Sequence, residues 1–220
     1  MKIKIEKKFR GFKVDTLYDF SVLDKFKKVC IAGENGCGKS SLFQALRGLK
    51  NDSETSSMFE LDFKKIASNI SVEHSYEKIF YFDRVKDDGA NMNVAYDAVG
   101  FLSGGGLQTK DRSHGESSLI YFDLFMSKIK SKIVPNKTLI VLDEMDAGLS
   151  LATQTKVINL VNNLAYKMDC HVIIITHNPF LIADSILVFD FKNNELMASS
   201  DYLIRETGYS IKKENNDETI

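Results

Sequence analysis

One short stretch constrains the fold of this chain more than any other. Residues 33–40, Gly-Glu-Asn-Gly-Cys-Gly-Lys-Ser, fit the pattern G-x-x-x-x-G-K-[ST]. The apolar segment 28–32 before them is typical of a buried strand, and residues 41–49 after them are typical of a helix. In this context glycines let backbone N–H groups curl around a phosphate, and the helix N-terminus adds positive partial charge. The sequence therefore predicts a strand, a phosphate-binding loop and a helix in succession.

The same motif predicts how ATP and Mg²⁺ would be held. We expect Lys39 to reach the β- and γ-phosphates and Ser40 to bind Mg²⁺. The other loop residues would surround the phosphates with backbone and side-chain groups. The predicted nucleotide-binding residues of this segment are Gly33, Asn35, Gly36, Cys37, Gly38, Lys39, Ser40 and Ser41.

The composition favours one soluble domain. The chain has 220 residues, of which 44% are apolar, so it can bury a substantial core; we expect a single domain over 1–220 with a frayed polar tail at 212–220. Cys30, Cys37 and Cys170 lack the spacing of metal ligands and are typical of reduced thiols in a cytoplasmic protein. No apolar run approaches the roughly 20 residues that a membrane helix requires, so we expect no direct membrane insertion.

Charge gives little information on partners. The formal net charge of -1 provides no global electrostatic reason to bind nucleic acid. The start of the chain is basic, but such charges on an alternating strand are more often a solvated face than a binding site. These residues are Lys2, Lys4, Lys7, Lys8, Arg10 and Lys13.

Hydrophobic patterning predicts further elements around the loop. Strands are expected over 2–9, around 14–22, and over 78–82, 138–144, 170–177 and 186–191, with helices over 117–126 and 151–166. Ligands of a parallel sheet bind at the carboxyl ends of its strands. We therefore expect Asp143 to hold Mg²⁺, Glu144 to polarise an attacking water, and His177 to lie near the γ-phosphate.

The order of these motifs resembles ABC-type ATPases over nearly the whole chain. Residues 33–42 (GENGCGKSSL) match their Walker A segment and 138–144 (TLIVLDE) their Walker B segment. Residues 146–150 (DAGLS) look like the D-loop, and 175–178 (ITHN) look like the segment with the switch histidine. The resemblance implies an α/β P-loop NTPase fold of the ABC-ATPase type. That fold has a mostly parallel central sheet, flanking helices and a small N-terminal antiparallel β portion.

The resemblance also implies a signature segment that completes the ATP site of a second subunit. Residues 102–106 (LSGGG) match the usual LSGGQ signature better by letters, but 113–116 (SHGE) lead directly into an apolar helix whose N-terminus could face a phosphate. We choose 113–116. Ser113 and Gly115 are therefore expected to contact ATP in trans within an ATP-dependent homodimer, and Asp146 of the D-loop is expected at the same nucleotide.

Several details resemble the SMC and RecF-like branch of these ATPases rather than transporters. Met145 stands where transporter subunits usually carry Pro, and residues 9–12 (Phe-Arg-Gly-Phe) look like the opening of RecF-like chains. Residues 113–117 (SHGES) resemble a motif of compact, uncharacterised AAA-labelled ATPases. No obvious Q-loop Gln follows the first helix, and Asp83 and Arg84 occupy about that place.

We therefore expect an enzyme that hydrolyses ATP to ADP and phosphate, with Lys39, Glu144 and His177 as its catalytic residues. It would drive or switch a DNA or nuclease partner in DNA repair, DNA maintenance or anti-phage defence. The first alternative is the nucleotide-binding subunit of a membrane transporter, which would need a membrane partner and a coupling groove. The second alternative is a small-molecule P-loop kinase with a mobile lid and an acceptor pocket.

Overall fold

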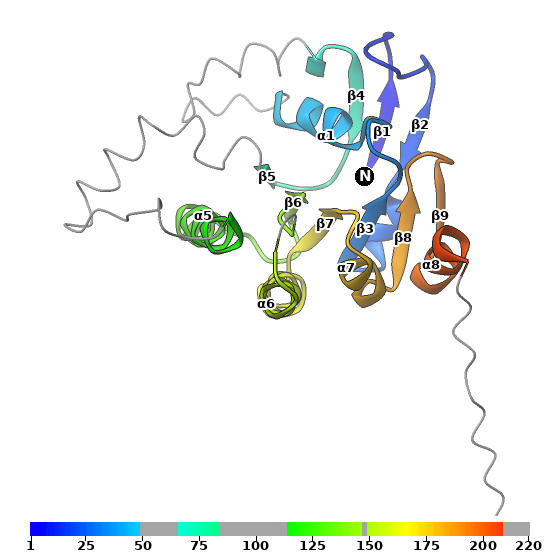
Figure 1. Ribbon diagram of the computed structural model, residues 1–220. Coiled ribbons are helices and arrows are strands. Elements are labelled where there is room, and N and C mark those ends of the chain that lie inside the picture. Colours follow the sequence, from blue (N-terminus) through cyan, green and yellow to red (C-terminus); the bar gives the residue numbers. More distant parts are fainter. Residues whose placement is uncertain (49–65, 84–113, 147–148, 209–220) are drawn as a thin grey trace, which may run out of the picture.

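The computed structural model describes residues 1–48, 66–83, 114–146 and 149–208, which form two β-sheets flanked by helices (Figure 1). The large sheet has the strand order β5-β6-β7-β3-β8-β9. Its strands are β3 (Lys28–Ala32), β5 (Lys78–Asp83), β6 (Thr138–Asp143), β7 (His171–Ile175), β8 (Leu187–Asp190) and β9 (Glu195–Ala198). Neighbouring strands are parallel except β8 and β9, which run antiparallel.

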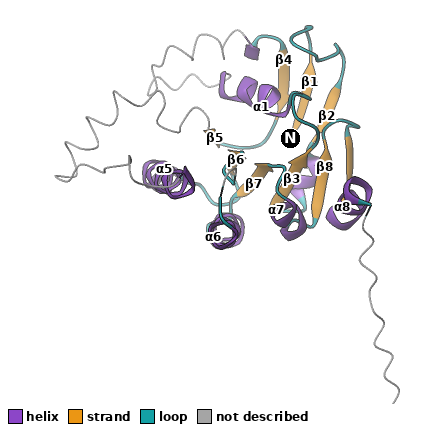
Figure 2. Cartoon of the chain, viewed as in Figure 1, coloured by secondary structure: helices purple, strands orange, loops and turns teal. Residues whose placement is uncertain are grey.

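A small antiparallel sheet and the helices cover the large sheet. The small sheet has the order β2-β1-β4 and consists of β1 (Lys2–Ile5), β2 (Leu17–Asp19) and β4 (Ile70–Glu73). The α-helices are α1 (Lys39–Gly48), α5 (His114–Ile129), α6 (Leu151–Asn162), α7 (Pro179–Asp184) and α8 (Ser199–Thr207). Figure 2 shows α5 to α8 on one side of the large sheet and α1 with the small sheet on the other. The predicted α/β architecture is thus confirmed.

Apolar cores form on both faces of the large sheet because successive residues of a strand point to opposite faces. Val141 of β6 and Ile173 of β7 belong to the core shared with α1 and the small sheet. Their neighbours Leu142 and Ile174 belong to the core shared with α5 and α6. Burial on both faces explains why these strands appear in the sequence as continuous apolar runs. Because β3, β6 and β7 run parallel, their carboxyl ends lie at one edge of the sheet.

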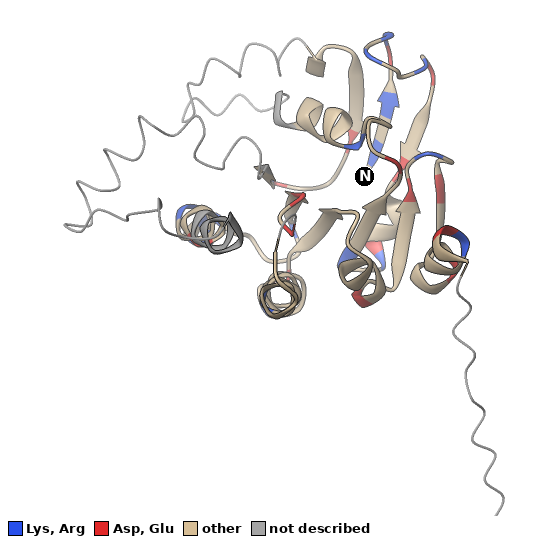
Figure 3. Ribbon diagram, viewed as in Figure 1, with Lys and Arg blue, Asp and Glu red and all other residues tan. Residues whose placement is uncertain are grey.

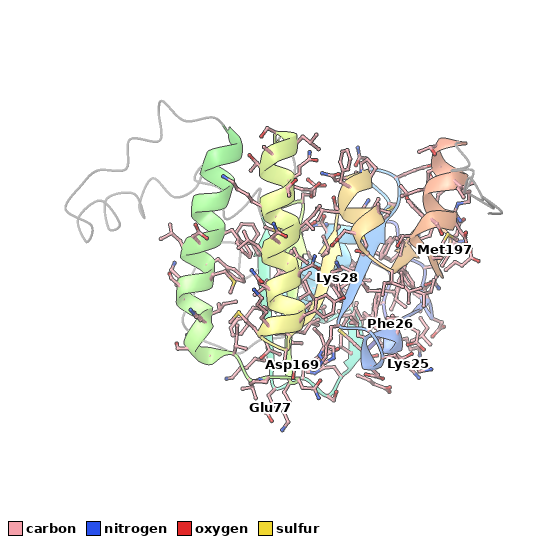
Figure 4. The ribbon with its side chains drawn as sticks, turned by 90° about the horizontal axis from the view of Figure 1, so that it is seen from below. Lys25, Phe26, Lys28, Glu77, Asp169 and Met197 are labelled. Carbon is pink, nitrogen blue, oxygen red and sulfur yellow. The ribbon has the colours of Figure 1, made fainter. Side chains whose placement is uncertain are left out.

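A buried lysine braces the opposite end of β3. The side chain of Lys28 is only 3% exposed, and its Nζ donates to Oδ1 of Asn162 at 2.8 Å and to the backbone oxygen of Asp184 at 3.0 Å. It also forms an ion pair with the Asp184 carboxylate. Figure 4 shows Lys28 between α6 and α7. Removing one partner of a buried ion pair destabilises a protein by about 3–5 kcal/mol, so this contact holds β3 firmly against both helices.

Several predicted boundaries differ from the structure. The strand expected around 14–22 is confined to β2 and is followed by a 3-10 helix, η1 (Ser21–Asp24). The helix expected over 151–166 ends as α6 at Asn162 and continues as a π-helix, η4 (Asn163–Lys167). A further 3-10 turn, η3 (Lys130–Lys132), extends α5. The elements α7, β9 and α8 were not predicted, and the expected tail at 212–220 lies outside the described residues.

The basic start of the chain is partly neutralised by neighbouring acids. Lys2 lies 4.0 Å from Asp19 of β2, and Lys4 lies 3.2 Å from Asp15. Figure 3 shows segments coloured blue for Lys and Arg along β1. Both lysines are more than 40% exposed, so these pairs fit a solvated face.

Within the described part of the chain, no helix has the length and apolarity needed to cross a membrane.

His171 is a titratable residue beside Tyr76, which belongs to the core shared with α1 and the small sheet. Its side chain is buried, and its ring centroid lies 5.2 Å from that of Tyr76. Among the described residues, Nδ1 of His171 has no hydrogen-bond partner. Burial and the positive charge of Lys27 lower the pKa of His171, while Asp169 and Asp24 oppose that shift. The folded protein therefore favours the neutral imidazole.

We predict that this histidine makes the protein less stable in mild acid. Below the ordinary histidine pKa of about 6.5, the unfolded chain binds a proton at this position that the folded chain resists, so stability falls as the pH drops through the lowered pKa. His171→Phe should flatten the dependence of the free energy of unfolding on pH between about 7.5 and about 5.5, measured by urea denaturation.

The control is His74→Phe, because His74 is exposed and stacks on the same Tyr76 ring. It shows whether replacing an imidazole beside Tyr76 by a phenyl ring is enough to cause the effect. If His171→Phe loses stability in acid as steeply as the unmodified protein, the account of His171 is wrong.

Candidate active site

The loop between β3 and α1 requires glycine at several positions. The φ angles of Gly33, Gly36 and Gly38 are 144°, 79° and 106°, a region that other residues rarely adopt. A Cβ atom on Gly38 would also lie 2.7 Å from Cζ of Phe12. Glycine is therefore needed at Gly38 both for its backbone conformation and for space. Asn35 and Gly36 at the tip of the loop are exposed.

Lys39 places a positive charge within this loop. Its side chain is buried, and Nζ donates to the backbone oxygens of Gly33 at 2.8 Å and Glu34 at 2.9 Å. The Sγ atom of Cys37 lies 3.7 Å from the same ammonium. Lys39 is also the first residue of α1, and helix N-termini attract anions through their free N–H groups. Charge and backbone donors thus converge where the sequence predicts phosphate.

Ser40 and Asp143 meet beside the loop. The Ser40 hydroxyl donates to Oδ1 of Asp143 at 3.1 Å, and Asp143 is only 3% exposed at the end of β6. Neighbouring ligands of an octahedral Mg²⁺ ion, each about 2.1 Å from the metal, lie about 3 Å apart. Hydroxyl and carboxylate oxygens are ligands that Mg²⁺ accepts. The pair therefore fits the metal site that the sequence predicts.

Glu144 follows Asp143 in a strained backbone conformation. Its φ angle is 49°, which in a residue other than glycine costs about 1–3 kcal/mol and is often found at functional sites. The N–H of Glu144 donates to the backbone oxygen of Ile175 at 2.9 Å, which anchors the residue to the neighbouring strand β7. The half-buried side chain of Glu144 thus emerges from a fixed turn at the carboxyl edge of the sheet.

His177 lies within electrostatic reach of the other predicted residues. It follows β7 and is exposed. Partial burial of the imidazole and the charge of Lys39 lower the pKa of His177, while Glu144 and Asp146 act in the opposite direction. Lys39 and Glu144, which are distant from His177 in the sequence, therefore influence the charge of its imidazole in the fold.

Asp146 braces the segment that carries His177. Asp146 is buried, and its Oδ2 accepts a hydrogen bond from the Thr176 hydroxyl at 2.7 Å. The same hydroxyl accepts the Asn178 N–H at 2.9 Å. These bonds link the turn after β6 to the turn after β7 on both sides of His177. The predicted contact of Asp146 with nucleotide stays a prediction.

Sequence reasoning missed the N-terminal segment that packs on the loop. The Arg10 guanidinium donates to the hydroxyl of Ser41, one of the predicted nucleotide-binding residues. Phe12 stacks on Phe9 with a centroid distance of 4.7 Å and contacts Gly38. The contacts of Arg10 with Ser41 and of Phe12 with Gly38 join residues 31 and 26 positions apart, so no local pattern could have revealed them.

The expected signature is only partly described. The helix after this segment begins as α5 at His114, so Gly115 lies in its first turn. Ser113 and the rival segment 102–106 lie outside the described residues, as does Arg84. The contact of Ser113 and Gly115 with ATP in trans stays a prediction.

Comparisons with known proteins identify the family and support the fold. The model of a family described as ABC transporter matches residues 20–156. An aliphatic sulfonates import ATP-binding protein, SsuB 1 of Streptomyces avermitilis, is 27% identical over 169 residues, which cover 74% of this chain and 62% of that protein. The chain thus spans less than two thirds of that relative.

Two further comparisons extend over more of the chain. The molybdate import ATP-binding protein MolC of Haemophilus influenzae is 26% identical over 201 residues, which cover 84% of this chain and 76% of that protein. A solved inward-facing ABC transporter has a TM-score of 0.54 at 20% identity, and the match covers 93% of this chain and 86% of that one. The structural likeness supports the predicted ABC-ATPase fold.

These comparisons show that the expected SMC and RecF-like branch is wrong. The family model and the relatives are of the transporter type, so the expected function in DNA repair or anti-phage defence is wrong as well. A DNA or nuclease partner has no support.

The structure explains why two residues were misleading about the branch. Met145 is 2% exposed in the apolar core, and Phe12 packs on the phosphate-binding loop. Packing can account for both residues without reference to any branch.

The matched region begins before β3 and runs through β6 into α6. It therefore contains the phosphate-binding loop, the Ser40–Asp143 contact and Glu144. This chain belongs to the ABC transporter family.

Proposed function

We propose that this protein is the ATP-hydrolysing subunit of a membrane transporter. The observation that carries the proposal is the 3.1 Å contact between Ser40 and Asp143, which joins the phosphate-binding loop to the end of β6 beside the buried Lys39. The sulfonate and molybdate relatives, both named import ATP-binding proteins, support a role in transport. The protein would work in the cytoplasm and reach the membrane through a separate subunit.

ATP binding would use the groups already gathered at the loop. Lys39 and backbone N–H groups of the loop bind the β- and γ-phosphates. The Ser40 hydroxyl and the Asp143 carboxylate would hold Mg²⁺, which would offset the negative charge of the phosphates. Arg10 adds a second positive charge at Ser41, next to the first turn of α1.

Hydrolysis would follow from the position of Glu144. The carboxylate takes a proton from a water molecule, whose oxygen attacks the γ-phosphorus. The bond from that phosphorus to the β-γ bridging oxygen breaks, and ADP leaves with the electron pair while phosphate forms. The hydrogen bond from the Glu144 N–H to Ile175 fixes the position of Glu144 after β6. His177, which follows the neighbouring strand β7, orients the γ-phosphate.

Two copies would close around two ATP molecules, with Ser113 and Gly115 of one copy facing the γ-phosphate held by the other. ADP lacks that phosphate, so hydrolysis removes the differential affinity that favours the closed state. Light scattering of Glu144→Gln should show a doubled mass with Mg-ATP but not with Mg-ADP. A monomer that demonstrably binds Mg-ATP would contradict closure of this chain with itself.

The transport role predicts a membrane-spanning partner. Chemical crosslinking in the source cell, followed by mass spectrometry of the products, should join this protein to a protein with several membrane-spanning helices. Lys39→Ala, which disables the loop without altering the outer surface, should retain that partner and serves as the control. Crosslinks only to non-membrane proteins would contradict a transport role.

A further inference from the structure

A phenol from the edge strand β5 reaches the carboxylate at the end of β6. The Tyr81 hydroxyl donates to Oδ2 of Asp143 at 2.6 Å, a short hydrogen bond typical of an ionised acceptor. Strands β5 and β6 are parallel, with Tyr81 opposite Val141 and Asp83 opposite Asp143. Tyr81 and Asp143 are therefore two register steps apart, which puts both side chains on the same face of the sheet.

That face is the one covered by α1. Tyr81 packs against the core that includes Val141 of β6 and Leu42 of α1. Ser40 lies in the first turn of the same helix and approaches Asp143 from that side. The carboxylate is thus flanked by a serine hydroxyl from the helix and a tyrosine hydroxyl from the neighbouring strand.

The two carboxylate oxygens have different partners. Oδ1 accepts from Ser40 and Oδ2 accepts from Tyr81. Each oxygen has two lone pairs, so an oxygen that accepts one hydrogen bond can still bind a metal. A hydrogen bond to Oδ2 fixes the rotation of the carboxylate and keeps Oδ1 directed at Ser40. Mg²⁺ requires nearly ideal octahedral geometry, so this orientation matters for metal binding.

We propose that Tyr81 is a positioning residue for the Mg²⁺ of bound ATP. Its hydroxyl holds Oδ2 of Asp143 so that Oδ1 and the Ser40 hydroxyl face the metal together. This inference rests on the proposed ATPase function and adds a residue that lies in neither the phosphate-binding loop nor the Walker B segment. Tyr81 acts through Asp143 and does not itself touch the phosphates.

Tyr81 should affect ATP binding in the presence of Mg²⁺ but not ATP binding without metal. Loss of the hydroxyl removes one hydrogen bond that orients the buried carboxylate, which weakens the metal contribution to ATP binding. Removing an outer hydrogen-bond partner of a metal ligand typically lowers metal affinity by about 10–100-fold. ATP binding without metal depends on Lys39 and the backbone N–H groups of the loop rather than on the Asp143 carboxylate. That component should remain intact.

The test uses the full chain carrying Tyr81→Phe. Calorimetry measures its affinity for ATP at increasing concentrations of Mg²⁺. This substitution keeps the ring that packs against α1 and removes only the hydroxyl. The Mg²⁺ concentration for half-maximal enhancement of ATP affinity should rise by about tenfold or more. ATP affinity in the presence of a chelator should stay within about twofold of that of the unmodified protein.

Two further variants give the largest expected effect and the absence of an effect. Asp143→Asn removes the proposed ligand charge and sets the largest expected loss of Mg²⁺ response. Tyr202→Phe removes a hydroxyl from a buried tyrosine that lies on α8, and it should leave the Mg²⁺ titration unchanged. Thermal unfolding of each variant shows that the folded state is retained.

Either of two results would overturn the inference. An unchanged Mg²⁺ titration for Tyr81→Phe would show that the hydroxyl does not position the ligand. An equal loss of ATP affinity with and without Mg²⁺ would show that Tyr81 supports the loop as a whole. By contrast, an unmodified protein that binds no ATP would overturn the proposed function itself, and this inference with it.

Discussion

The meeting of Ser40 with Asp143 depends on the order of strands in the large sheet. Ser40 follows β3, Asp143 ends β6, and β7 lies between those two strands. Because all three run parallel, their carboxyl ends lie at one edge, and the residues that follow them share one site. Glu144 and His177 occupy that edge for the same reason. A change in strand order or direction would disperse these side chains even if every motif were intact.

The apolar cores on both faces of the large sheet make this edge rigid. The buried faces of β6 and β7 hold the strands between α1 on one side and α5 and α6 on the other. Lys28 fixes the opposite end of β3 against α6 and α7. The loop itself is held by Phe12, which leaves no space for a side chain on Gly38. A rigid support of this kind lets Glu144 keep a strained backbone conformation at the point where hydrolysis is proposed.

The sequence predicted the elements whose signals are local. The glycines and Lys39 of the loop, and the apolar runs of β6 and β7, follow from short patterns, because burial on both faces requires apolar residues throughout. The bond from Tyr81 to Asp143 spans 62 positions and depends on strand register, which no local pattern encodes. The six-residue helix α7 is too short to show helical periodicity.

The central claim is that Glu144 removes a proton from water while the loop holds ATP. It is tested most directly by phosphate release at saturating Mg-ATP, with bound ATP measured in the same samples, for the unmodified protein, Glu144→Gln and Lys39→Ala. Glu144→Gln should bind ATP normally but release phosphate at least about a hundredfold more slowly, whereas Lys39→Ala should fail to bind ATP. Phosphate release by Glu144→Gln at the rate of the unmodified protein would contradict this claim.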